Sequence, residues 1–149
     1  MKIEGELILS ASADKIWEML QDPAFLAEIL PGCKELKPSG KDQFKGILEA
    51  KVGPISSQYT TQFSIHDKNP PHSYLLKIAG NGKGGFVRAD TFVSLHPQKT
   101  TTIFKYHGEA TIGGTIARVG QRLVDAAAKM LINKGFKSLQ EKVEERMKE

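Results

Sequence analysis

The sequence predicts an α+β domain in which a long C-terminal helix covers the concave face of a curved antiparallel sheet of about seven strands. Apolar and polar residues alternate through most of residues 34–112, which is typical of strands with one buried face. Apolar residues then recur at helical spacing from 115 to 143. The apolar face of a sheet must be covered, and this final helix is the only element long enough to cover it.

Two short helices are expected after the first strand. Residues 1–10 alternate loosely and predict that strand. Ser12 is a typical N-cap for a helix that contains Trp17, and Asp22-Pro23 begins a second helix. Pro31-Gly32 ends the second helix, because proline and glycine both disfavour its continuation.

Turn residues divide the alternating region into separate strands. Breaks are expected at Gly53-Pro54 and at Asn69-Pro70-Pro71, and Gly80–Gly85 is expected to be a glycine-rich turn. Gly113-Gly114 ends the sheet, after which Thr115 is expected to cap the long helix.

The long helix contains one glycine and ends in charged residues. Gly135 predicts either a bend or close packing, because glycine costs about 1 kcal/mol relative to alanine inside a helix. Residues 140–149 are expected to be a solvated end, with a charged tail from about residue 144. Residues 1–149 are expected to form a single domain, which is usual for a chain of this length.

Composition and charge exclude several classes of protein. The longest uncharged apolar stretches fall far below the roughly 20 residues that cross a bilayer, and no secretory signal is present. The net charge is +4, and residues 115–149 carry eight basic and five acidic residues. This share of acidic residues is too large for a nucleic-acid-binding face. A weak attraction to an anionic surface stays open. With one cysteine and no signal, the chain is expected to be cytoplasmic.

Two features that look like chemical motifs have simpler explanations. Gly80–Gly85 contains G-x-G-x-x-G but joins two strands, whereas dinucleotide binding needs a strand followed by a helix. Cys33 has no inward histidine to act as a base, so we expect a small buried thiol rather than a nucleophile. Neither feature predicts a catalytic or nucleotide site.

The other titratable residues show no catalytic or metal-binding pattern. Arg88 and Asp90 share one face of a strand and are expected to form a surface ion pair. No acid and base share an inward face, so the sequence supports neither general acid–base catalysis nor a metal site. The histidines lack the spacing of metal ligands and are expected at the surface; they are His66, His72, His96 and His107.

The inward apolar residues are candidates for a ligand cavity between the sheet and the helix. Small residues at facing positions remove the bulk that a filled core needs, and inward tyrosines can orient a carbonyl or hydroxyl group of a ligand. The expected cavity residues are Leu48, Tyr59, Phe63, Tyr74, Leu76, Ile78, Phe104, Tyr106, Ala110, Leu123, Ala127 and Leu131. The expected gate lies on the short helices and the glycine-rich turn and consists of Phe25, Leu30, Pro31, Gly32, Cys33, Gly82, Gly84 and Phe86.

Several segments, in order along nearly the whole chain, resemble one known family. Asp22–Leu36 reads DPAFLAEILPGCKEL and is similar to that family's DPE-x-L and IPGC-x-x-L segment. Residues 113–127 are similar to its GG-x-x-A-x-x-G-x-R-L-x-D-x-A helix start. The sequence thus resembles the CoxG family of carbon monoxide dehydrogenase subunits. That family belongs to the START/SRPBCC superfamily, and the resemblance implies its helix-grip fold.

The resemblance also implies a function. Members of the family accompany molybdenum-type carbon monoxide dehydrogenases and are held to help dock them at the membrane, with an isoprenoid quinone as the implied occupant of the cavity. Many members carry an apolar C-terminal anchor, whereas this sequence ends in charged residues.

Three functions stay open at this point. The first is a non-catalytic accessory protein that binds a quinone or similar lipophilic molecule, needs no other cofactor, and assists a membrane-linked oxidoreductase at the inner face of the membrane. The second is a docking subunit without a physiological ligand, which would contact its partner through the basic helix side at Arg118, Arg122 and Lys129. The third is a small helix-grip enzyme, a cyclase or hydrolase, which would need polar groups inside the cavity.

Overall fold

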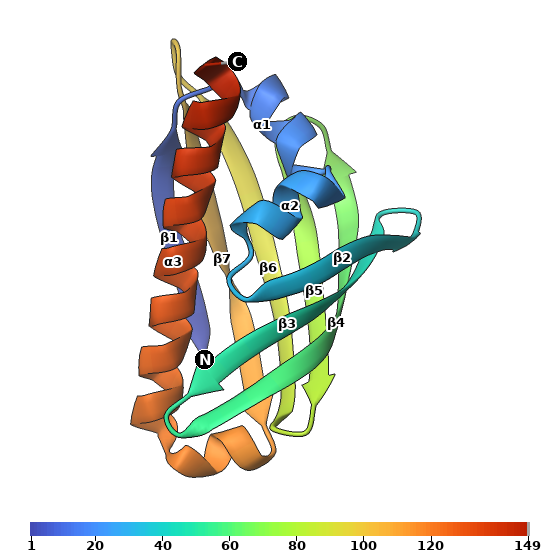
Figure 1. Cartoon of the computed structure of the whole chain (residues 1–149). Coiled ribbons are helices and arrows are strands. Elements are labelled where there is room, and N and C mark those ends of the chain that lie inside the picture. Colours follow the sequence, from blue (N-terminus) through green and yellow to red (C-terminus); the bar gives the residue numbers. More distant parts are fainter. Residues whose placement is uncertain (149) are drawn as a thin grey trace.

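The computed structural model describes residues 1–148 as one antiparallel sheet with helices packed against it (Figure 1). The strands are β1 (Lys2–Leu9), β2 (Cys33–Gly40), β3 (Gln43–Val52), β4 (Ile55–Asn69), β5 (Ser73–Gly82), β6 (Gly85–Pro97) and β7 (Thr102–Gly113). The helices are α1 (Ala13–Leu20), α2 (Pro23–Ile29), the short 3₁₀ helix η1 (Thr115–Val119) and α3 (Gln121–Lys148).

The sheet has seven strands in the order β1-β7-β6-β5-β4-β3-β2, and neighbouring strands are antiparallel throughout. Strands β2 to β7 follow one another in sequence, and β1 completes the sheet by pairing with the last strand, β7. The sheet curves around α3, which contacts both β1 and β3, while α2 contacts β2 and α3 (Figure 1). This arrangement confirms the predicted fold class.

The elements define two ends of the molecule (Figure 1). At the first, the α1 end, lie α1 and the last turns of α3. At the second, the η1 end, lie η1, the β3–β4 turn, the β5–β6 turn and the first turn of α3. The two ends differ in how the space between sheet and helix is filled.

The caps of the two short helices are those that the sequence predicts. The Ser12 side-chain oxygen accepts a hydrogen bond from the Lys15 backbone N–H at 3.4 Å. The Asp22 carboxylate accepts one from the Ala24 backbone N–H at 3.0 Å, and Pro23 occupies the first turn of α2. Each cap satisfies a backbone donor that the helix itself cannot pair.

The start of the long helix differs from the prediction. Thr115 does not cap it, because residues Thr115–Val119 form the separate helix η1 and α3 begins only at Gln121. Gly120 stands between the two helices with a φ of 106°, a conformation that interrupts the helix and that glycine adopts without strain. The backbone N–H of Ile116 donates to the Gly84 carbonyl oxygen at 2.7 Å and thereby fixes η1 to the β5–β6 turn.

The glycine-rich turn and the C-terminal end are more regular than predicted. Strand β5 continues to Gly82 and β6 begins at Gly85, so only two residues form the turn. Residues 140–148 are the last turns of α3. Within them Val143 is fully buried, whereas Glu144, Glu145, Met147 and Lys148 are exposed. Glu149, the last residue of the expected tail, lies outside the described residues. At Gly135 α3 continues without interruption, and a Cβ added there would meet Pro31 at an ordinary contact distance of 3.5 Å, so nothing in the structure explains the glycine.

The buried core occupies the α1 end. Its side chains come from both short helices, from the strands and from the end of α3, and Trp17 packs edge-on against the Tyr74 ring with 5.4 Å between centroids. Complete burial of a large apolar side chain contributes roughly 1.5–3 kcal/mol, which identifies the main source of stability. The core residues with the least exposure are Leu9, Ala11, Ile16, Phe25, Leu139 and Val143.

The turn after α2 is fixed by a glycine with positive φ. Gly32 has a φ of 71°, and its carbonyl oxygen accepts a hydrogen bond from the Glu49 backbone N–H at 2.9 Å. A side chain at this position would collide with the Glu49 carbonyl oxygen. The close approach therefore holds the end of α2 against β3.

We predict that Gly32→Ala destabilises the protein by more than Gly53→Ala does. Gly53 has a similar φ of 60°, but an added Cβ there meets only Leu123, at an ordinary contact distance of 3.5 Å. Gly53→Ala should cost about 1–2 kcal/mol for the left-handed backbone alone. Gly32→Ala adds the collision with Glu49. Urea denaturation of both variants measures the difference, and equal losses would contradict this account of the turn.

Candidate ligand cavity

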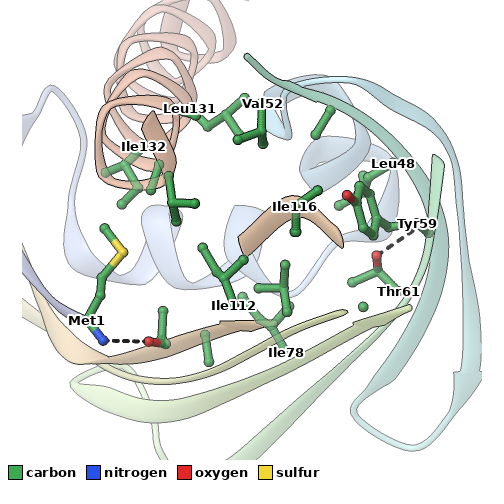
Figure 2. Close-up of a pocket in the computed structure, with 18 of the residues that line it drawn as sticks. Met1, Leu48, Val52, Tyr59, Thr61, Ile78, Ile112, Ile116, Leu131 and Ile132 are labelled. Carbon is green, nitrogen blue, oxygen red and sulfur yellow. Dashed lines mark hydrogen bonds between the residues drawn. The ribbon is translucent and has the colours of Figure 1, made fainter. Parts of the chain in front are cut away.

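A cavity of about 290 Å³ lies at the η1 end between the sheet and α3 (Figure 2). Its walls come from β1, β3, β4, β5, β6, β7, η1 and α3, together with Pro31 after α2. Nearly all of the lining side chains are aliphatic. An apolar enclosure with few polar groups is the usual form of a binding site for an apolar molecule.

The cavity exists because inward side chains become smaller toward the η1 end. On β7 the inward residues run from Phe104 and Tyr106 to Gly108 and Ala110. Small residues also line the cavity on three other strands, Ala50 on β3, Gly80 on β5 and Ala89 on β6. Since protein interiors are normally filled to crystal-like density, this loss of volume leaves space that the backbone does not close.

Helix α3 shows the same change in size along its inward face. Ala127 and Ala128 line the cavity, and Leu131 and Ile132 follow one turn later. The stretch nearer the C-terminus carries Leu139, which is buried in the core. Sheet and helix therefore both reduce their bulk at the same level of the molecule.

Tyr59 supplies the principal polar group of the cavity wall. Burial raises the pKa of its phenol, and the neighbouring Ser57 hydroxyl partly offsets this effect, so the phenol stays protonated at neutral pH. Thr61 also lines the cavity, but its hydroxyl donates to the Tyr59 carbonyl oxygen at 3.3 Å (Figure 2). The Tyr59 hydroxyl can therefore act as a hydrogen-bond donor toward a ligand.

Hydrogen bonds connect the elements around Tyr59. Gly84 donates its backbone N–H to the Ser57 hydroxyl at 3.1 Å, and its carbonyl oxygen is the acceptor for Ile116. A Cβ added to Gly84 would lie 2.7 Å from the Tyr59 hydroxyl oxygen, so glycine leaves the room that the phenol occupies. Ile116 projects into the cavity from η1 (Figure 2). This end of the cavity is thus built from β4, the β5–β6 turn and η1 together.

On the opposite side, Met1 lies along the wall. Its amino group donates to the Ala110 carbonyl oxygen at 2.7 Å, and its carbonyl oxygen accepts from the Ala110 N–H at 2.8 Å (Figure 2). These two bonds extend the pairing of β1 with β7 and hold Met1 in place.

Half of the residues expected to line the cavity do so in the structure. These are Leu48, Tyr59, Ile78, Ala110, Ala127 and Leu131. Five others face inward but belong to the core or pack against it at the α1 end, namely Phe63, Tyr74, Leu76, Phe104 and Tyr106. Burial strongly raises the pKa of the Tyr74 phenol, which contacts Trp17 rather than the cavity.

Leu123 was wrongly expected inside the cavity. Its side chain is 47% exposed, because the first turn of α3 extends to the β3–β4 turn and packs near Gly53 rather than against the sheet.

The lining residues that sequence reasoning missed include Ala50, Ala89 and Ile116. The alternating pattern already places the two alanines on the inward face. Ile116 follows the helical apolar spacing, but it was not assigned to the cavity, and it lies in the separate helix η1.

The residues expected to form a gate lie in several different environments. Pro31 lines the cavity and Gly84 lies against Tyr59. Phe25 is fully buried in the core beneath the Arg146 guanidinium and lies away from the cavity. Leu30 packs against the core, and Cys33 is half-buried. The backbone at Gly32 and at Gly82 lies close to carbonyl oxygens of neighbouring strands. Phe86 is partly exposed beside Gly113. Their role as a gate stays a prediction.

The remaining chemical candidates do not converge on the cavity. His66 and His96 are exposed and contact the Ser64 and Ser94 hydroxyls, each at 2.9 Å. Among residues 1–148, no three His, Cys, Asp or Glu side chains gather in a group that could hold a metal ion. Burial raises the pKa of the Cys33 thiol, which lowers its nucleophilic fraction at neutral pH.

The predicted ion pair between Arg88 and Asp90 is wrong. Arg88 donates instead to the Gly80 carbonyl oxygen at 3.1 Å and to the Asn81 side-chain oxygen at 3.0 Å. These acceptors lie on the adjacent strand β5, one and two residues beyond Ala79, which is opposite Arg88 in the register of β5 and β6. Across residues 1–148, no helix combines the length and apolar character needed to span a membrane.

Solved structures similar to this chain define its class. A conserved protein from Geobacillus kaustophilus is 31% identical, with a TM-score of 0.90 over 97% of this chain and 96% of that one. A START superfamily protein from Mycobacterium smegmatis is 14% identical, with a TM-score of 0.71 over 97% of each chain. An aromatase/cyclase, Zhui from Streptomyces sp. R1128, is 13% identical, with a TM-score of 0.69 over 99% of this chain and 95% of that one. The chain thus has a START-like fold.

Residues 5–144 match the family of the carbon monoxide dehydrogenase subunit CoxG. The chain belongs to this family, as its sequence segments predicted. A comparison with the curated proteins gives no match. The family is described as a subunit of carbon monoxide dehydrogenase, which supports an accessory role.

Proposed function

We propose that this protein binds a lipophilic small molecule, a quinone or a related isoprenoid, in the cavity between the sheet and α3. It acts as a non-catalytic accessory protein of a membrane-linked oxidoreductase of the carbon monoxide dehydrogenase type. The observation that carries the proposal is the cavity of about 290 Å³ with almost entirely aliphatic walls. The family, which is described as a subunit of carbon monoxide dehydrogenase, supports the choice of partner.

Affinity in such a site comes mainly from burial of apolar surface. Each Å² of apolar surface removed from water contributes about 25 cal/mol, which is offset in part by the lost freedom of the bound molecule. The Tyr59 hydroxyl can donate one hydrogen bond to a quinone carbonyl and so orient the ring. A single polar contact selects an orientation while the apolar walls supply the binding energy.

The size of the cavity limits how much of a ligand it holds. Pockets for drug-sized molecules usually measure about 300–1,000 Å³, so a cavity of about 290 Å³ lies at the small end of that range. A quinone ring with a short side chain fits this volume. A long prenyl tail would extend beyond the cavity, which suits a carrier that works in the cytoplasm at the inner face of a membrane.

We predict that a bound quinone or prenyl lipid depends on Ala127 and not on its neighbour Ala126. Ala127 lines the cavity, whereas Ala126 is exposed on the outer face of α3. Ala127→Phe fills the cavity and should abolish binding, while Ala126→Phe adds the same ring outside it. The measurement is mass spectrometry of organic extracts from both variants and the wild type, purified from a bacterium that makes isoprenoid quinones.

The expected result is a lipid in the wild type and in Ala126→Phe, with loss in Ala127→Phe. A wild-type protein that stays empty even after incubation with quinone-containing vesicles would contradict the ligand-binding proposal. Equal lipid content in the two variants would show that the lipid binds elsewhere.

A docking subunit is the second candidate, favoured by the outer surface of α3 and η1. Arg118, Arg122 and Lys129 are exposed, and within residues 1–148 none of them forms an ion pair. The apolar side chains of Leu123 and Met130 are exposed on the same stretch of chain. A basic surface with exposed apolar residues suits an acidic protein partner or an anionic membrane surface.

We predict that reversing the three basic charges to Glu weakens co-purification with a molybdenum-type carbon monoxide dehydrogenase. The control reverses three exposed lysines on strands and a loop of the sheet, Lys45, Lys77 and Lys99, so that the net charge changes equally. Retention of the enzyme should fall with salt for the wild type and the control, because exposed charge pairs are screened. Equal retention by the two variants would contradict a docking role for this surface.

A further inference from the structure

Three aromatic rings form a layer on the α1 side of the cavity. Tyr106 and Phe136 lie with ring centroids 4.4 Å apart, and Phe104 lies 5.6 Å from Phe136 and 6.2 Å from Tyr106. The rings come from β7 and α3, the two elements that face each other across this part of the molecule. We refer to these three residues as the aromatic layer.

The aromatic layer follows directly after the cavity on both elements. Phe136 lies one helical turn beyond Ile132, which lines the cavity. Tyr106 lies two inward positions from Ala110, which also lines it, with only Gly108 between them. The aromatic rings therefore follow Ala110 and Gly108 on β7 and Ile132 on α3.

The layer also reaches the edge strand β1. The Tyr106 hydroxyl group lies against Gly5, where an added Cβ would collide with it. On the other side of the molecule, Leu48 and Ile78 line the cavity and also pack against the core. Leu48 and Ile78 line the cavity where it meets the core, and Tyr106 and Phe136, which do not line it, pack against the core in the layer behind. We call this boundary the floor.

We propose that Phe136 and Tyr106 set the depth of the cavity and thereby the length of the apolar chain that the protein accepts. This proposal rests on the ligand-binding function proposed above and specifies its selectivity. Phe136 is the better position for a test because it is only half-buried, whereas Leu139 and Val143 beyond it are buried in the core. Truncation of Phe136 is expected to extend the cavity toward the aromatic layer, by at most about one helical turn, roughly 5.4 Å.

The test is a chain-length series of straight-chain alcohols from hexanol to hexadecanol. The alcohols displace the dye anilinonaphthalenesulfonate from the wild type, from Phe136→Ala and from a control, Phe86→Ala. Phe86 is a partly exposed aromatic residue beside Gly113 and lies outside the aromatic layer. Each additional pair of methylenes that the cavity accommodates should improve affinity about tenfold, until the chain reaches the floor.

We expect the wild type and Phe86→Ala to share one optimal chain length, and Phe136→Ala to prefer longer alcohols. Circular dichroism checks that the variants fold. Phe136→Leu, a smaller change, should shift the optimum in the same direction by less and serves if Phe136→Ala does not fold. If the wild type binds alcohols but the folded Phe136 variant prefers the same chain length as the wild type, the proposed floor is wrong while the ligand-binding function stands. Absence of wild-type binding at every chain length would overturn the proposed function as well.

Discussion

The packing of α3 against the concave face of the sheet is the interaction on which both the stability and the cavity depend. At the α1 end, large side chains from the helix and the strands interlock, and Phe25, Leu139 and Val143 are almost wholly removed from water. At the η1 end, the same helix presents Ala127 and Ala128 to a sheet that presents Ala50, Ala89 and Ala110. One continuous interface therefore serves as a core over part of its length and as a container over the rest.

This division has a physical cost. A cavity in a protein interior forgoes contacts, and empty volume costs on the order of 24 cal/mol per Å³ in engineered cores. The η1 end can stay open because other parts of the molecule stabilise the fold. These are the filled core at the α1 end, the two capped helices and the close approach of Gly32 to β3. A bound apolar molecule would restore the missing contacts, which is why an apolar cavity of this kind favours occupation by a ligand.

The sequence predicted the elements more completely than the site, for physical reasons. Alternation reports which face of a strand is buried, and caps such as Ser12 and Asp22 report where helices begin. Neither signal shows whether an inward residue lies nearer the α1 end or the η1 end of its strand. Phe63 and Tyr59 therefore looked equivalent, although Phe63 lies in the core and Tyr59 lines the cavity. Leu123 follows the helical period but extends past the sheet, and η1 was hidden because Gly120 interrupts a stretch with helical spacing. The family resemblance gave the fold, which the comparisons then confirmed.

The central claim is that the η1 end holds an open apolar space while the α1 end is filled. A crystal structure under xenon pressure tests it most directly, because xenon enters dry apolar cavities and scatters strongly. Xenon is expected beside Ala110 and Ala127 and not among Phe25, Leu139 and Val143. If the η1 end holds no xenon, because side chains have collapsed into the space or ordered water fills it, then the apolar space does not exist as described.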